Sequence, residues 1–145
     1  MNADVNQLSI FLPVFVIVAL TAIAFLRMAV ARARATKERT DSATYYRAYQ
    51  GPPEADYAII AVRHYGNLFE APVLFYAASI IAFAVGGVTS WLLVWAWGYV
   101  AARLVQSTIH LTFNNPLYRG LAFSISWLFL IALWVTLAME IIGRL

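Results

Sequence analysis

Two stripes of polar side chains lie inside hydrophobic stretches of the sequence, where ionisable groups are costly and by default mark a functional site. The first stripe consists of Arg63, Asn67 and Glu70. The second, in the next hydrophobic stretch, consists of Arg103, Gln106 and His110. The spacings are i, i+4, i+7 and i, i+3, i+7, so in a helix each stripe occupies one face. Such faces predict the wall of a polar pocket.

The two stretches are joined by a short connection, so we expect neighbouring antiparallel helices. Matched by depth, the stripes form facing layers, which are Arg63 with His110, Asn67 with Gln106, and Glu70 with Arg103. An ion pair in the deepest layer would keep either charge from being buried alone. Alternatively, these residues are structural and join the helices by hydrogen bonds. Because they exceed what two helices need to associate, we interpret them as a pocket that opens to the cytoplasm.

The composition places these stripes in an integral membrane protein. Of the 145 residues, 63% are hydrophobic and 12% are charged, and the mean hydropathy is +0.74. Average soluble domains have about 45–50% apolar and about 25% charged residues. A soluble domain of this length could not bury so much apolar surface, so a cytosolic enzyme and a disordered chain are excluded.

The residue types also limit the possible sites and partners. The chain has no cysteine, which excludes a disulfide scaffold, a thiolate nucleophile and a cysteine-ligated metal. Its two histidines, His64 and His110, are too few for a metal site unless carboxylates join them, so no metal is expected. We assign the net charge of +3 to basic loops at an anionic lipid surface and expect no nucleic-acid partner.

The chain contains several hydrophobic segments of sufficient length, about 20 residues, to cross a bilayer. They cover approximately residues 10–30, 57–84, 91–113 and 121–142. Because the bilayer offers no water to the backbone, each should be helical. The sequence therefore predicts an all-α integral membrane protein, a four-transmembrane-helix bundle with up-down topology in one domain over residues 1–145. Pro72 predicts a kink in the second span beside Glu70.

Basic residues set the predicted orientation. The first connection, residues 31–54, carries Arg32, Arg34, Lys37, Arg39 and Arg47. Arg119 lies in the third connection, whereas the N-terminal segment and the second connection have no lysine or arginine. By the positive-inside rule the first and third connections are cytoplasmic and both termini lie outside. The run Gly51-Pro52-Pro53-Glu54 predicts a stiff break before the second span.

The stretch R-H-Y-G-N-L-F-E-A-P, residues 63–72, resembles the second-helix signature of the family of membrane-associated proteins in eicosanoid and glutathione metabolism (MAPEG). That signature is an arginine, three residues, an asparagine, two residues, a glutamate and a nearby proline. Residues 101–110 look like the bacterial branch of the family, as does Arg119 at the head of the fourth span. The chain length, the spans and the long basic first loop agree with this resemblance.

The resemblance implies a homotrimer of four-helix protomers in the bacterial inner membrane, with glutathione bound between protomers at the cytoplasmic side. The implied glutathione contacts are Arg63, Asn67, Glu70, Arg103, Gln106 and His110. Arg119 is the implied catalytic residue, because a guanidinium beside the thiol favours the thiolate, which is the nucleophile. That thiolate would attack a lipophilic electrophile or reduce a hydroperoxide. Lipid and the electrophile are the other implied partners, and no metal is implied.

Two other functions are weighed against a glutathione-dependent enzyme. A small multidrug transporter that exchanges protons for cations also has about four short spans, but its carboxylate belongs in the first span. A non-catalytic member of the family would keep the fold and lose the chemistry. Many glutathione-using members have a tyrosine where this chain has Ala71, and tyrosines of their third helix are replaced by Gln106 and His110. Arg119 aligns with their activating arginine only with a two-residue insertion in the third loop.

The predicted orientation is open to a direct test. Reporter fusions placed after Glu54 and after Gly87 should report opposite sides of the membrane, because one predicted span separates them. Fusions that report the same side would refute the arrangement of four spans.

Overall fold

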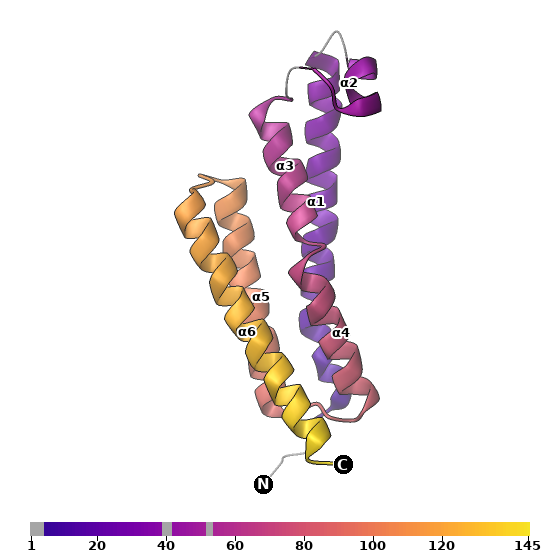
Figure 1. Ribbon diagram of the computed structural model, residues 1–145, viewed down its shortest axis with the longest axis vertical. Coiled ribbons are helices and arrows are strands. Elements are labelled where there is room, and N and C mark those ends of the chain that lie inside the picture. The colour runs from indigo at the N-terminus through magenta and orange to yellow at the C-terminus, as the bar shows by residue number, and fades with distance from the viewer. Residues whose placement is uncertain (1–4, 39–41, 52–53) are drawn as a thin grey trace.

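The computed structural model describes residues 5–38, 42–51 and 54–145, with the backbone alone for residues 42–44. All regular elements among these residues are helical, with a 3-10 helix, η1, at the start. In order they are η1 (Gln7–Ile10), α1 (Phe11–Glu38), α2 (Ser42–Ala48), α3 (Asp56–Asn67), α4 (Ala71–Ala84), α5 (Ser90–Leu111) and α6 (Pro116–Ile142). The chain runs up α1, down α3 and α4, up α5 and down α6, so α1 begins and α6 ends at the same end of the molecule, opposite α2 (Figure 1). This arrangement agrees with the predicted all-α, up-down bundle.

Three helical segments are long and apolar enough to cross a membrane, and they are Gln7–Glu38, Asp56–Ala84 and Pro116–Ile142. The 22-residue α5 is not among them. It is long enough for a span, but Arg103, Gln106 and His110 lower its hydropathy. The fourth crossing therefore stays a prediction. Large apolar side chains cover the outside of the helices, as expected of a surface that faces lipid, for example Phe15, Leu128 and Met139.

The core is made where α5 and α6 pack as a hairpin and α1 and α4 close over it. Its centre contains Phe75 stacked on Tyr99, with ring centroids 4.7 Å apart. The hairpin is closely packed, and Trp95 Nε1 donates a hydrogen bond to Thr136 Oγ1 at 3.1 Å across it. A second, smaller cluster of Leu20, Ala24 and Leu68 joins α1 to the end of α3.

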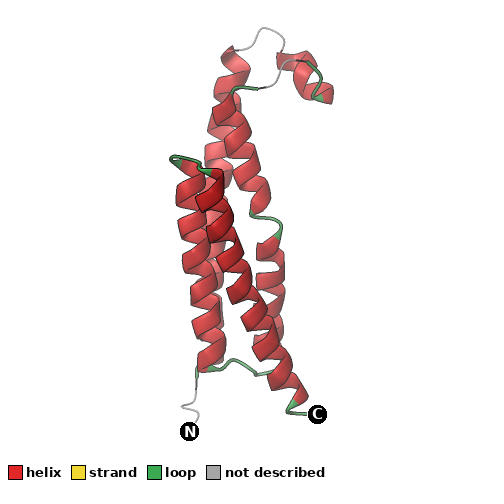
Figure 2. Ribbon diagram, turned by 60° about the vertical axis from the view of Figure 1, so that its left-hand side comes forward, coloured by secondary structure: helices red, strands yellow, loops and turns green. Residues whose placement is uncertain are grey.

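The second predicted span is not one continuous helix, which corrects the expectation of a single helix with a kink. Helix α3 ends at Asn67 and α4 begins at Ala71, and the break is visible as a loop between them (Figure 2). Pro72 lies in the first turn of α4, where its missing N–H is tolerated, but it cannot continue a helix from α3. Glu70 is therefore the N-cap residue of α4 and does not share a helix face with Arg63.

The first connection is largely helical, whereas a loop was expected over residues 31–54. Helix α1 continues to Glu38, which accepts hydrogen bonds from Arg34 Nε at 2.8 Å and from Tyr57 Oη at 2.6 Å. These contacts join the extended end of α1 to the start of α3. Helix α2 follows, and Arg32 donates to Tyr49 Oη at 2.5 Å, which holds α2 against α1. The predicted Pro52-Pro53 break and the basic Arg39 lie outside the described residues.

The connection between α4 and α5 is held by residues from both ends of the chain. Gln7 Nε2 donates to the Val88 carbonyl at 3.2 Å, and the Val88 N–H donates to Gln7 Oε1 at 2.8 Å. Arg144 donates to the carbonyls of Val85 and Gly86 at 2.5 and 3.1 Å. Arg144, the one basic residue on the side predicted to lie outside, therefore satisfies loop carbonyls.

Close packing of the hairpin depends on Gly98, and this gives a stability prediction. A Cβ atom at residue 98 would lie 2.5 Å from the ring of Phe129, so Gly98→Ala must displace that ring. We expect a loss of about 1–3 kcal/mol in the free energy of unfolding, as for other overpacked cores. Thermal unfolding in detergent measures it, with the exposed Val105→Ala on the same helix as control. Equal stability of Gly98→Ala and the wild type would contradict the described packing.

Candidate functional site

One cavity has a volume of about 220 Å³ and is lined by Asn67, Glu70, Gln106, Pro116, Arg119, Gly120 and Phe123. A second has a volume of about 290 Å³ and is lined by Arg63, Gly66, Asn67, Glu70, His110 and Arg119. Because Asn67, Glu70 and Arg119 line both, the cavities form one site.

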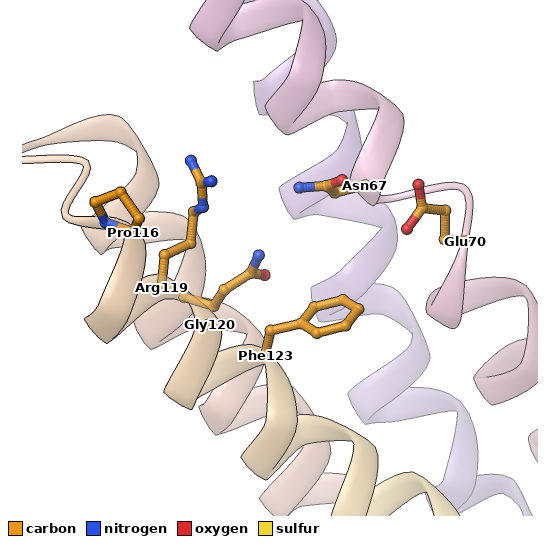
Figure 3. Close-up of a pocket in the computed structure, with 7 residues that line it drawn as sticks. Asn67, Glu70, Pro116, Arg119, Gly120 and Phe123 are labelled. Atoms are coloured by element: carbon orange, nitrogen blue, oxygen red, sulfur yellow. The ribbon is translucent and has the colours of Figure 1, made fainter.

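The wall supplied by α6 carries Arg119, whose guanidinium faces Asn67 across the gap (Figure 3). The turn before α6 positions this side chain. Asn114 has a left-handed backbone conformation with φ of 45°, and its Oδ1 accepts a hydrogen bond from Arg119 Nη1 at 2.8 Å. Asn115 caps α6 by accepting from the Leu117 N–H at 2.9 Å. Two adjacent asparagines therefore end one helix, start the next and orient the arginine.

The opposite wall is the break itself, and it is held by Arg103 from α5. The side chain is fully buried, with 0% exposure, and its Nη2 donates to the Asn67 carbonyl at 2.7 Å. That carbonyl is one of the groups that the end of α3 leaves without a helical partner. The guanidinium also lies over the ring of Phe123, 5.7 Å from its centroid. Arg103 thus sits behind the cavities, with Phe123 between α6 and the break.

The ion pair predicted between Glu70 and Arg103 is not formed. Among the ion pairs of the described part of the chain, none joins these two residues within 4.0 Å. The prediction assumed that α3 continues through Glu70, whereas the break turns the Glu70 side chain toward the cavity (Figure 3). The two charges are still near enough to interact electrostatically.

The floor of the site is the polar face of α5. Gln106 and His110 are 2% and 1% exposed, and in the described part of the chain Gln106 Oε1 and both ring nitrogens of His110 have no hydrogen-bond partner. The His110 ring contacts the ring of His64 on α3, edge to face, with centroids 5.2 Å apart. The described residues hold no group of three or more histidine, aspartate or glutamate side chains that could bind a metal ion.

Most of the residues predicted for the site are brought together. Those that line the cavities are Arg63, Asn67, Glu70, Gln106, His110 and Arg119. Arg103 is the exception, because it contacts backbone and not the cavity. The residues that the sequence did not indicate are Asn114, Pro116, Gly120, Phe123, Gly66 and His64. The Asn-Asn-Pro turn is a recognisable helix start, which could have placed Asn114 beside Arg119.

Comparison with known proteins establishes the class. The model of the MAPEG family matches residues 10–139, which is nearly the whole chain, so the protein belongs to the MAPEG family. The resemblance carried by residues 63–72 is thereby confirmed. Together with the three apolar helical segments, the family identifies an integral membrane protein. Among curated proteins and among solved structures, no significant match to the chain is found.

Because no ion pair joins Glu70 to Arg103, we expect the two side chains to contribute independently to stability. Because Glu70 is exposed and forms no ion pair with a described residue, Glu70→Gln should change the free energy of unfolding by no more than about 0.5 kcal/mol. In a double-mutant cycle with Arg103→Gln, the coupling should also stay below about 0.5 kcal/mol. Glu140→Gln, a half-buried carboxylate at the far end that lies 3.9 Å from Arg144, is the control for loss of a carboxylate charge away from the site. A coupling energy well above about 1 kcal/mol would show that Glu70 and Arg103 form a direct ion pair and would contradict this prediction.

Proposed function

We propose that the protein is a membrane-bound, glutathione-dependent transferase or peroxidase-like enzyme that acts on lipophilic electrophiles. Membership of the MAPEG family supports this class. The observation that carries the proposal is the charge pattern of the site, in which Arg63 and Arg119 stand around Asn67 and Glu70. Glutathione has two carboxylates, one ammonium group and one thiol, so this pattern is its complement.

Each residue has a role that its chemistry supports. Arg63 binds a carboxylate through its planar fork, Glu70 binds the ammonium group, and Asn67 serves either. Gln106 and His110 offer further hydrogen-bonding atoms that have no partner among the described residues. Arg103 acts indirectly, since its bond to the Asn67 carbonyl fixes the break from which Asn67 and Glu70 reach the ligand.

Arg119 is the residue that activates the thiol. It lies in the first turn of α6, where the helix already presents partial positive charge, and its guanidinium adds a full one. The thiol loses its proton to water, and the sulfur forms a bond to the electrophilic carbon as the leaving group departs with its electron pair. The hydrogen bond that Arg119 Nη1 donates to Asn114 Oδ1 holds the guanidinium in the cavity throughout.

A homotrimer with the ligand bound between protomers is part of the proposal. Arg63 and Glu70 are exposed in the single chain although they line the cavities, so one side of the site is open. A neighbouring protomer would close that side. The positively charged first connection supports a cytoplasmic site in a bacterial inner membrane, with both termini outside.

The transporter alternative is disfavoured by the position of the acidic residues. The carboxylate of α1 is Glu38, at its last position, and it is bound to Arg34 and Tyr57. Glu70 shares its cavity with Arg63 and Arg119. A cavity that binds a cation through a carboxylate would be expected to have apolar walls and not two arginines. A non-catalytic member of the family would retain the fold but not thiol conjugation.

Thiol conjugation separates these functions. Purified protein in detergent should conjugate glutathione to a chloronitrobenzene acceptor, with a rate above that of the uncatalysed reaction. A transporter or a non-catalytic protein would leave the rate at the uncatalysed level, and that result would overturn the proposal.

Substitution of Arg119 tests most specifically which residue activates the thiol. Arg119→Lys keeps the charge but loses the fork of donors, so conjugation should fall about tenfold, which is ~1.4 kcal/mol of transition-state stabilisation. Membrane insertion and assembly should stay intact, and ultraviolet difference spectra should show less bound thiolate. Arg144→Lys, at the opposite end of the molecule, is the control. If Arg119→Lys has the turnover and the bound thiolate of the wild type, Arg119 serves only to set the membrane orientation. Another arginine would then have to activate the thiol.

A further inference from the structure

Two glycines line the cavities, Gly66 from α3 and Gly120 from α6, of which Gly120 is labelled in Figure 3. A Cβ atom built on either would meet no heavy atom within 4 Å. Neither glycine has a positive φ, so the backbone does not require glycine there. In a helix, glycine is less stable than alanine by about 0.5–1 kcal/mol. No contact with the described residues therefore explains why both positions lack a side chain.

Gly98 shows what a glycine needed for packing looks like in the same molecule. A Cβ atom there would lie 2.5 Å from the Phe129 ring, so close approach of α5 and α6 requires the glycine. Gly66 and Gly120 have the opposite environment, open space beside a polar cavity. This contrast indicates that their space is kept for something outside the protomer.

Buried polar atoms at the floor of the same cavities point to a ligand. His110 and Gln106 are 1% and 2% exposed, yet both ring nitrogens of His110 and Oε1 of Gln106 have no hydrogen-bond partner. The large majority of buried side-chain polar atoms in native proteins have a hydrogen-bond partner. His110 lines the cavity of Gly66, and Gln106 lines the cavity of Gly120. Each cavity is therefore lined by one glycine and by one buried side chain that lacks a hydrogen-bond partner among the described residues.

We propose that Gly66 and Gly120 are ligand-contact positions, against which the main chain of the bound peptide thiol lies in direct contact with both helix backbones. An extended peptide is thin and presents N–H and carbonyl groups that can reach Gln106 and His110. The two cavities, of about 220 and 290 Å³, form one site with Gly66 on one wall and Gly120 on another, so a methyl group at either position would narrow the space for the ligand. The inference rests on the proposed function, because it takes glutathione as the ligand.

The test uses Gly66→Ala and Gly120→Ala in the full-length protein in detergent. The Kd of glutathione is measured by calorimetry, stability by thermal unfolding, and assembly by cross-linking. Gly143→Ala, at the C-cap of α6 and far from the cavities, is the control for binding, although a Cβ there would lie 3.3 Å from the Met139 carbonyl oxygen. We expect both cavity variants to unfold at or above the wild-type temperature, because alanine favours the helix. Their Kd should nevertheless rise about tenfold or more, whereas the control keeps the wild-type Kd.

Three results would overturn the inference, and they are distinguishable. Wild-type binding with Kd values of both variants within twofold of it would refute the glycine contacts and leave the proposed function standing. Loss of assembly in the variants, with binding retained, would assign the glycines to contacts between protomers. Absence of glutathione binding by the wild type would overturn the proposed function and the inference with it.

Discussion

The hydrogen bond from Arg103 to the Asn67 carbonyl is the interaction on which the rest of the site depends. A helix that stops inside a hydrophobic layer leaves carbonyls without partners, and in lipid each costs several kcal/mol of free energy. The buried guanidinium satisfies one of them at 2.7 Å. The chain can therefore end α3 at Asn67 and restart as α4 at Ala71. This break directs Asn67 and Glu70 into the cavities.

One hairpin supports both sides of the site. Helix α5 carries Arg103, Gln106 and His110, and α6 carries Arg119 and Phe123, so packing of α5 against α6 fixes all of them relative to one another. Close approach at Gly98 and the bond between Trp95 and Thr136 hold that hairpin together at the other end. The site can consequently be open on the side of α3 while its floor stays rigid. Such a division suits a ligand that enters from one side.

Much of the site could be predicted from the sequence because its residues are polar in apolar surroundings. Polar side chains in a membrane span are recognisable because burying them in lipid costs free energy, and this applies to Arg63, Asn67, Gln106 and His110. Their helical spacing places them on two facing stripes. The pairing of Glu70 with Arg103 could not be predicted, since periodicity assumes an unbroken helix through Pro72. Gly66, Gly120 and Phe123 carry no such signal, because small and apolar residues are ordinary in a membrane helix. Their role depends on space, which only coordinates reveal.

Hydrogen exchange at the break tests the central claim most directly. The Leu68 and Phe69 N–H groups donate to Tyr65 and Gly66 at 3.1 and 2.9 Å, in the turn that Arg103 supports. Residue-resolved exchange would be compared in the wild type and in Arg103→Met. We expect these two amides to exchange about tenfold faster in the variant, a loss of about 1.4 kcal/mol of local protection, while exchange of the α6 amides is unchanged. Identical exchange of Leu68 and Phe69 in both proteins would contradict the claim that Arg103 holds the break.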